Sequence, residues 1–159
     1  MTNLPAAVVV ASNRAAAGVY ADTTGPLIVD ALRRLGFEVG EPVVVPDGQP
    51  VAEAIAEAVA AGARVVLTTG GTGLTPTDRT PEATRPLLDR EIPGIAESIR
   101  AYGAAKGVPS AVLSRGVAGV MGDCLVVNLP GSRGGVRDGL AVLEPVLVHA
   151  AEQIVGSDH

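Results

Sequence analysis

The chain has 159 residues, a formal net charge of −5 and one cysteine, and its length fits a single domain over residues 1–159. An acidic chain lacks the basic surface that non-specific binding to nucleic acid or to anionic membrane requires, so neither is an expected partner. One cysteine forms no intramolecular disulfide, and the first residues lack the cationic start and apolar run of a signal peptide, so we expect the cytoplasm.

Strand and helix patterns alternate along the first half of the chain. Small aliphatic residues predict a buried strand over 6–11, and a loop follows over 12–25. Pro26 suits the first position of a helix that ends before Gly36. Strand character returns over 37–45, and the apolar stripe that starts at Val51 predicts a second helix, which ends at Gly62.

In the second half, the run 64–69 is the strongest strand candidate and leads directly into a glycine-rich loop. Thr80 followed by Pro81 predicts a helix N-cap, and a further helix is expected over 94–105. Residues 111–114 and 124–129 are predicted as antiparallel or mixed strands around a glycine-rich turn at 119–122, with Cys124 as a core thiol. Pro145 should bend or divide the last helical stretch.

This alternation predicts a three-layer α/β/α fold with a mostly parallel, mixed central sheet. Such folds bind ligands beyond the carboxyl ends of their strands, and three unusual loops follow predicted strands. We therefore expect these loops to meet at one edge of the sheet and to form a ligand site.

The first of these loops contains Thr69, Gly70, Gly71, Thr72 and Gly73. Glycine allows backbone amides to approach a ligand closely, and the threonines add hydroxyl groups, so the loop suits an anion or a pterin. It matches neither a Walker loop nor the dinucleotide fingerprint. A tight turn that binds nothing explains this loop alone about equally well.

Two aspartates are candidate catalytic and metal-binding residues. Asp78 precedes the helix predicted at Thr80, and because Thr80 takes the cap position, a functional carboxylate is the favoured interpretation of Asp78. Asp47 lies in a Pro-Asp-Gly turn, where stabilisation of the turn would explain it if it stood alone. Together, two carboxylates at one edge could hold Mg²⁺, which often uses one or two carboxylates plus substrate phosphates.

The remaining loop starts at Asn128 and continues through Pro130, Gly131 and Ser132 into a predicted helix. Backbone amides, the Ser132 hydroxyl and the positive end of the helix together predict a phosphate site, although an ordinary glycine-rich connection is the alternative. Arg14 is a further candidate contact for an anion, and a solvated surface arginine is the alternative there.

These segments resemble the molybdopterin-binding proteins of molybdenum-cofactor biosynthesis, whose enzymatic members are molybdopterin adenylyltransferases. The resemblance rests on several segments across nearly the whole chain. They are 68–73, 78–84 and 128–132, supported by 12–14, 18–20, Asp22 and 46–47. Asn13 stands where members often have aspartate, and Arg133 to Gly135 depart from the continuation seen in some members.

The resemblance implies that molybdopterin reacts with MgATP to give adenylylated molybdopterin and pyrophosphate, with Asp47 and Asp78 as the essential carboxylates and metal ligands. It assigns Ser12, Arg14, the loop Thr69 to Gly73, Asn128 and Pro130 to Ser132 to ligand binding. It also implies a homotrimer or larger homo-oligomer, and the molybdate-insertion protein is a candidate partner. A non-catalytic pterin carrier and a scaffold with dispensable aspartates are the alternatives.

Overall fold

The computed structural model describes residues 2–156 of the chain. Within this range, seven strands form one sheet. Its strand order is β2-β1-β4-β7-β6-β5, and β3 also pairs with β1. The pairs among β1, β2, β3, β4 and β7 are parallel, whereas β5 and β6 add an antiparallel edge. The strands are β1 (Pro5–Ala11), β2 (Glu38–Val39), β3 (Val43–Val45), β4 (Val65–Thr69), β5 (Arg90–Glu91), β6 (Ala118–Met121) and β7 (Cys124–Leu129).

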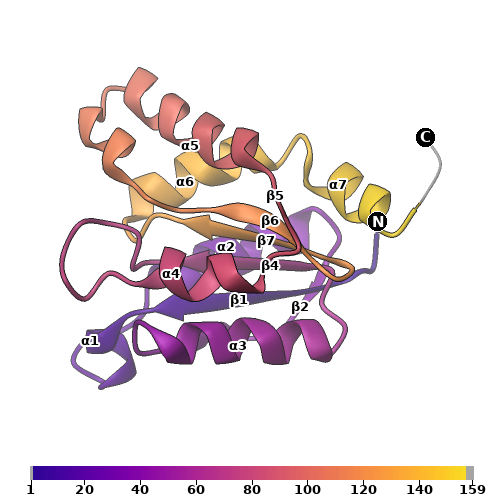
Figure 1. The fold of residues 1–159 in the computed structure, drawn as a ribbon, viewed down its shortest axis with the longest axis horizontal. Helices are drawn as coiled ribbons and strands as arrows, with labels where there is room; N and C mark the ends of the chain where they lie inside the picture. The colour runs from indigo at the N-terminus through magenta and orange to yellow at the C-terminus, as the bar shows by residue number, and fades with distance from the viewer. Residues whose placement is uncertain (1, 157–159) are drawn as a thin grey trace.

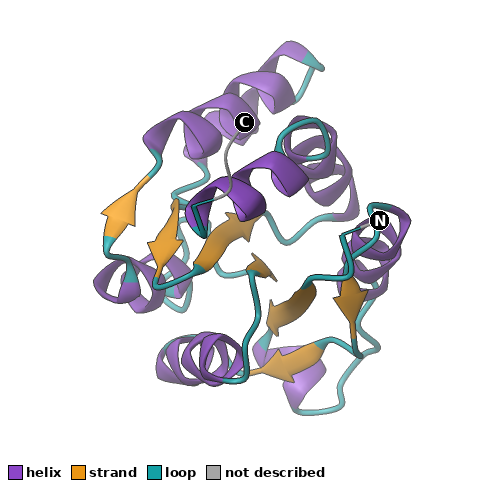
Figure 2. Cartoon of the chain, turned by 90° about the vertical axis from the view of Figure 1, so that its right-hand side faces the viewer, coloured by secondary structure: helices purple, strands orange, loops and turns teal. Residues whose placement is uncertain are grey.

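Helices cover both faces of this sheet (Figures 1 and 2). The α-helices are α1 (Asn13–Ala16), α2 (Thr24–Arg34), α3 (Gln49–Ala60), α4 (Thr80–Thr84), α5 (Pro93–Ala105), α6 (Arg133–Leu143) and α7 (Leu147–Ile154). Two short 3-10 helices, η1 (Arg85–Leu87) and η2 (Pro109–Leu113), complete the set. Within residues 2–156, no helix has both the length and the apolar character needed to cross a bilayer.

Two apolar clusters, one on each face of the sheet, form the core. Val8 and Val10 point to the face covered by α2, α5, α6 and α7, whereas their neighbours Val9 and Ala11 point to the face covered by α3. This alternation follows from the two-residue period of a strand, and burial on both faces explains why the strands consist of aliphatic runs. The predicted three-layer α/β/α fold is confirmed, and Cys124 lies fully buried as a core thiol.

The strand predicted at 111–114 is wrong, because the 3-10 helix η2 occupies that position. There Ala111 packs so closely on α5 that a Cβ at Gly103 would lie 2.7 Å from the Ala111 Cβ. The turn predicted around 119–122 is instead mostly strand β6, which extends to Met121. Gly119 pairs with Glu91 of β5 and Val126 of β7, and this strand position needs glycine because a Cβ there would collide with the Arg90 carbonyl.

Other boundaries differ in smaller ways. The helix expected from Pro26 already begins at Thr24, since the Asp22 carboxylate accepts hydrogen bonds from the Thr24 and Gly25 amides. The single strand expected over 37–45 is divided into β2 and β3, which pair with opposite ends of β1. The last helical stretch is divided near Pro145, as predicted.

The register of the parallel strands brings their carboxyl ends to one edge. Ala11 pairs with Val45, and Val10 and Leu129 both pair with Thr69. The chain passes from β1 to β2 and β3 on one side of β1, and then to β4 on the other side. The order in which the chain adds strands to the sheet therefore reverses between β1 and the parallel strand β4. In doubly wound folds, such a point leaves a crevice that binds ligands.

Candidate functional site

The loops after β1, β4 and β7 meet at this edge through contacts that only glycine permits. Gly70 has a φ of +91°, and a Cβ there would collide with the carbonyl oxygen of Ala11 at the end of β1. A Cβ on Gly131 would lie 3.1 Å from the Gly70 Cα. The Thr69 hydroxyl donates a 2.6 Å hydrogen bond to the Pro130 carbonyl and so joins the loops after β4 and β7. The predicted meeting of the segments that carry Gly71, Asp78 and Gly131 is confirmed, since all three line one cleft, and the end of β1 lies beside them.

The glycine-rich loop also lies against both predicted carboxylates. A Cβ on Gly71 would collide with the Asp47 carboxylate and with the Thr80 hydroxyl. A Cβ on Gly73 would lie 2.8 Å from an Asp78 carboxylate oxygen. Two aspartates that are 31 residues apart in sequence therefore flank one short loop, and the absence of side chains on Gly71 and Gly73 makes room for them.

The Asp47 carboxylate is partly committed to backbone amides. Its Oδ1 accepts hydrogen bonds from the Gly48 amide at 2.7 Å and from the Arg79 amide at 2.9 Å. Burial raises the pKa of Asp47, the two amide hydrogen bonds oppose that rise, and the nearby charges of Asp78 and Glu82 add to it. A cation bound beside Asp47 would favour its ionised form.

Thr80 is not the helix N-cap that was predicted from the sequence, because Arg79 occupies that position. Thr80 is the first residue of α4 and caps nothing through its side chain, and its buried hydroxyl has no hydrogen-bond partner among the described residues. The Asp78 Oδ2 instead accepts a 3.0 Å hydrogen bond from the Thr75 amide, which closes a turn. Asp78 nevertheless lines the main cleft.

The main cleft, with a volume of about 780 Å³, opens where the loops after β4 and β7 face α5, η2 and α6. Three cationic side chains line it, Arg100, Lys106 and Arg137, together with the acidic residues Asp78 and Asp138. Of the predicted residues, it contains Gly71, Thr72, Gly73, Asp78, Pro130, Gly131 and Ser132. The cations explain how an acidic protein could hold an anionic ligand locally. They could not be predicted from sequence, because Arg100 and Arg137 lie within helices and Lys106 directly follows α5, all outside any motif.

A smaller hollow of about 210 Å³ lies between the ends of β1 and β4. Ser12 lines it, and its hydroxyl caps α1 through the Ala15 amide and shares a 3.1 Å hydrogen bond with the Tyr20 hydroxyl. Arg14 stacks on the Tyr20 ring at 5.0 Å from its centre. Gly131 lines both hollows, so the Gly70 and Gly131 backbones form the boundary between them.

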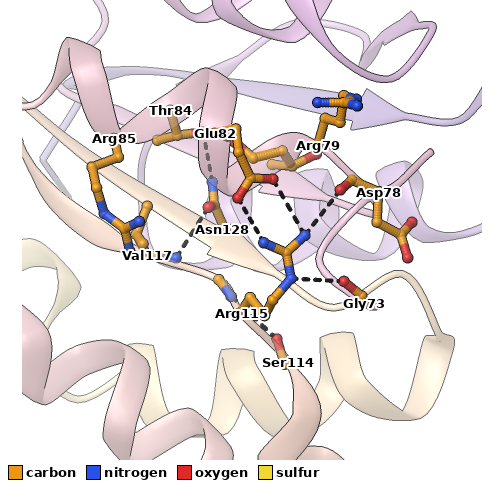
Figure 3. Close-up of polar contacts among 12 residues, drawn as sticks. Gly73, Asp78, Arg79, Glu82, Thr84, Arg85, Ser114, Arg115, Val117 and Asn128 are labelled. Atoms are coloured by element: carbon orange, nitrogen blue, oxygen red, sulfur yellow. Dashed lines mark hydrogen bonds and ion pairs between the residues drawn. The ribbon is translucent and has the colours of Figure 1, made fainter. Parts of the chain in front are cut away.

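Of the predicted site residues, Asn128, Arg14 and Asp47 line neither hollow, and Asn128 lies inside the protein. Its side chain is buried and supports the site from within. The carbonyl oxygen accepts from the Val117 amide at 3.0 Å, and the amide nitrogen donates to the hydroxyls of Thr68 at 2.9 Å and Thr84 at 3.1 Å. These bonds connect β7 to β4 and to α4, the helix that follows Asp78. Figure 3 shows the bonds of Asn128 with Thr84 and Val117.

The residues present fit a divalent cation only with help from a substrate. Within residues 2–156, no three His, Cys, Asp or Glu side chains gather closely enough to hold a metal ion. Asp47 and Asp78 each use one carboxylate oxygen for the hydrogen bonds described above, which leaves the other oxygen of each free of those bonds. Such a pair suits Mg²⁺, which keeps several waters and is completed by substrate phosphates.

Comparisons with known proteins agree on one family. The model for a probable molybdopterin binding domain matches residues 7–149. The chain is 39% identical over 97% of its length to a molybdenum cofactor biosynthesis bifunctional protein from Synechococcus elongatus, of which it covers 48%. It is 37% identical over 89% of its length to the molybdopterin adenylyltransferase of Pyrococcus furiosus, of which it covers 86%.

Comparison with solved structures indicates the same family. The molybdopterin biosynthesis Mog protein from Mycobacterium ulcerans superposes with a TM-score of 0.90 at 54% identity, covering 95% of this chain and 99% of that one. The chain spans about half the length of the bifunctional relatives and most of the length of the single-function ones. The chain therefore belongs to the molybdopterin-binding domain family of molybdenum-cofactor biosynthesis.

Proposed function

We propose that this protein transfers the adenylyl group of MgATP to the phosphate of molybdopterin and releases pyrophosphate. The observation that carries the proposal is the arrangement of the Gly71 to Gly73 backbone, which lies directly against Asp47 and Asp78 beside a cleft lined by cations. Relatives named molybdopterin adenylyltransferase, 32–39% identical to this chain, support the same reaction.

The reaction needs two anionic ligands held side by side, and two hollows separated by the Gly70 and Gly131 backbones suit this need. An oxygen of the molybdopterin phosphate attacks the α-phosphorus of ATP, the bond to the bridging oxygen breaks, and pyrophosphate leaves with the bonding electrons. The protein supplies no nucleophile. Its contribution is to position the ligands and neutralise charge, which is what phosphoryl-type transfers mainly require.

Each group in the cleft has a defined part in this proposal. Arg100, Lys106 and Arg137 bind and orient the anionic ligands, and the Ser132 end of α6 adds a helix N-terminus. Asp47 and Asp78 would hold Mg²⁺, which supplies charge neutralisation at the phosphates when it is bound. The glycine backbone allows the two carboxylates to lie directly against the loop at the edge of the cleft.

Two rival functions predict different results. A non-catalytic carrier would bind molybdopterin but release no pyrophosphate, and a scaffold would tolerate loss of both aspartates. We test the proposal with a single-turnover assay in which purified chain is mixed with molybdopterin and MgATP. We expect pyrophosphate and adenylylated molybdopterin to appear in equal amounts, and both to depend on Mg²⁺. Binding of molybdopterin without any pyrophosphate would reject the enzymatic proposal in favour of the carrier.

The proposal includes an assembly and a location. We propose that the protein acts in the cytoplasm as a homotrimer or larger homo-oligomer and passes its product to the molybdate-insertion protein. Several large apolar side chains are exposed and could be covered in such contacts, among them Leu74, Val108 and Leu113, which line the cleft. Light scattering of the purified chain would measure the number of copies.

A further inference from the structure

The segment that carries Asp78 has little packing of its own. Between Gly73 and Asp78, residues 74–77 are all exposed, including the Leu74 side chain at 64%. The segment contains one turn, in which the Asp78 amide donates to the Thr75 carbonyl at 3.0 Å. An exposed loop with few buried contacts is usually mobile, so its geometry must be set by bonds at its ends.

Arg115, which lies between η2 and β6, forms bonds with both ends of this segment. Its Nε donates to the Gly73 carbonyl at 2.9 Å, and its Nη2 donates to the Asp78 carbonyl at 2.9 Å. Its backbone amide donates to the Thr72 carbonyl at 2.8 Å. Figure 3 shows the guanidinium between the two loop ends. One planar group thus sets the separation between the first and last residues of the loop.

The same guanidinium connects the loop to α4. Its Nη1 lies 2.6 Å from Glu82 Oε2, and its Nη2 lies 3.3 Å from Glu82 Oε1. The hydrogen bond from Arg115 lowers the pKa of Glu82, and the pair is partly exposed. Exposed ion pairs of this kind contribute little to stability, so we do not expect the ion pair to be the main effect of Arg115.

Arg115 lies outside the main cleft and lines a separate hollow beside α4 and α5. It is absent from the residues that line the main cleft, whereas Asp78 and Gly73 line it. In Figure 3, the Asp78 carboxylate points away from the guanidinium, which contacts only the backbone carbonyl of that residue. Arg115 therefore holds the backbone of Asp78 without occupying its carboxylate, whose Oδ2 accepts the hydrogen bond from the Thr75 amide.

From these contacts we infer that Arg115 is a positioning residue, a clamp that fixes the Gly73 to Asp78 loop so that the Asp78 carboxylate faces the cleft. The inference rests on the proposed adenylyl transfer for its effect on catalysis. Its structural part stands separately, because it concerns the loop alone. Lysine could not replace arginine, since one ammonium lacks the planar fork that reaches several fixed acceptors at once.

The test compares the full-length wild-type chain with Arg115→Gln and Arg115→Lys. Pyrophosphate release with molybdopterin and MgATP gives kcat and KM, and amide hydrogen exchange reports on the loop. We expect both variants to lose kcat on the order of 100-fold, with KM changing less than about threefold, because a misplaced group costs the chemical step more than binding. The amides of Thr75, Asp78 and Arg79, all hydrogen-bonded in the wild type, should exchange at least about tenfold faster.

Two controls separate the clamp from a general charge effect. Arg85→Gln removes another partly exposed ion pair, that of Arg85 with Glu91 at 3.0 Å, and should leave both kcat and loop exchange unchanged. Glu82→Gln removes the ionic partner of Arg115 but keeps its two bonds to the loop carbonyls, so kcat should fall less than about threefold. A loss in Glu82→Gln as large as in Arg115→Gln would overturn the clamp.

The remaining outcomes also decide the inference. The inference would be refuted if Arg115→Lys kept the wild-type kcat. It would also be refuted if the loop amides of Arg115→Gln exchanged their hydrogens at the wild-type rate. If Arg115→Gln does not fold, Arg115→Lys carries the same comparison. If the wild-type chain releases no pyrophosphate, the proposed function fails by itself, and the exchange data alone then support or refute the clamp.

Discussion

Replacing Asn128 with alanine separates a supporting role from a ligand-binding role at this position. The side chain makes three hydrogen bonds of 2.9 to 3.1 Å inside the protein, and Asn128 is only 5% exposed. The bond from the Val117 amide continues the pairing of β6 with β7 beyond Ala118 through a side chain. Loss of this side chain should therefore weaken the connection between neighbouring strands.

The size of the effect follows from these bonds. The buried Val117 amide would lose its acceptor at a cost of about 1–3 kcal/mol, and each lost bond to the Thr68 and Thr84 hydroxyls would cost about 1 kcal/mol. The freed hydroxyls can rotate, and alanine loses no rotamer entropy on folding, so we expect a net loss of about 3 kcal/mol in the free energy of unfolding. For a urea slope of about 2 kcal/mol/M, the midpoint should fall by about 1.5 M.

Urea unfolding at fixed protein concentration measures this change, since an oligomer's stability depends on concentration. Asn13→Ala is the matched control. Asn13 is exposed, makes a single bond to the Asp47 amide, and should change the unfolding free energy by less than about 1 kcal/mol. Folded Asn128→Ala should bind molybdopterin with nearly wild-type affinity. A stable variant that binds molybdopterin poorly would refute this reasoning and restore Asn128 as a ligand contact.

Three further predictions concern the site and the core. Asp47→Asn and Asp78→Asn should each lower pyrophosphate release on the order of 100-fold or more with the circular dichroism spectrum unchanged, and full turnover in both would remove their assigned roles. Gly71→Ala should also abolish turnover, because its φ is +69° and its Cβ would collide with the Asp47 carboxylate and the Thr80 hydroxyl. The same assay on Gly40→Ala, where an added Cβ meets nothing within 4 Å and which lines neither hollow described above, should show activity retained. Burial raises the pKa of Cys124 to about 12, so the thiol of the folded protein stays protonated below that pH. Iodoacetamide at pH 8.5 should therefore label Cys124 only as fast as the chain unfolds. Rapid labelling without urea would contradict the burial of this thiol.

Much of the fold follows from local pattern. Strand β4 and helix α5 were each predicted to within one residue of their observed bounds. The division of the last helical stretch near Pro145 was also expected. These features depend on hydrophobic period, helix length and proline, all of which are local properties. The meeting of the loops at one edge also follows, because parallel strands place their carboxyl ends together.

The site was predictable only where motif and topology coincide. The loop from Thr69 to Gly73, together with Asp78, occupies the expected edge, and Asp47 joins it from the end of β3. Thr80 was taken for a helix cap because threonine before proline usually is one, but in the folded chain it is buried against Gly71. The role of its hydroxyl thus depended on a neighbour nine residues away, which no local rule contains.

The layered α/β architecture, the edge where the site loops meet and the choice of the two candidate carboxylates could all be predicted from sequence, since each follows from periodicity, strand direction or a motif. In contrast, the position of Gly119 in a strand, the internal hydrogen bonds of Asn128 and the bonds of Arg115 to both ends of the Gly73 to Asp78 loop became visible only in the folded chain. These roles depend on contacts between segments far apart in the chain. A side chain's hydrogen-bond partners are chosen by packing, and packing is set by the whole fold.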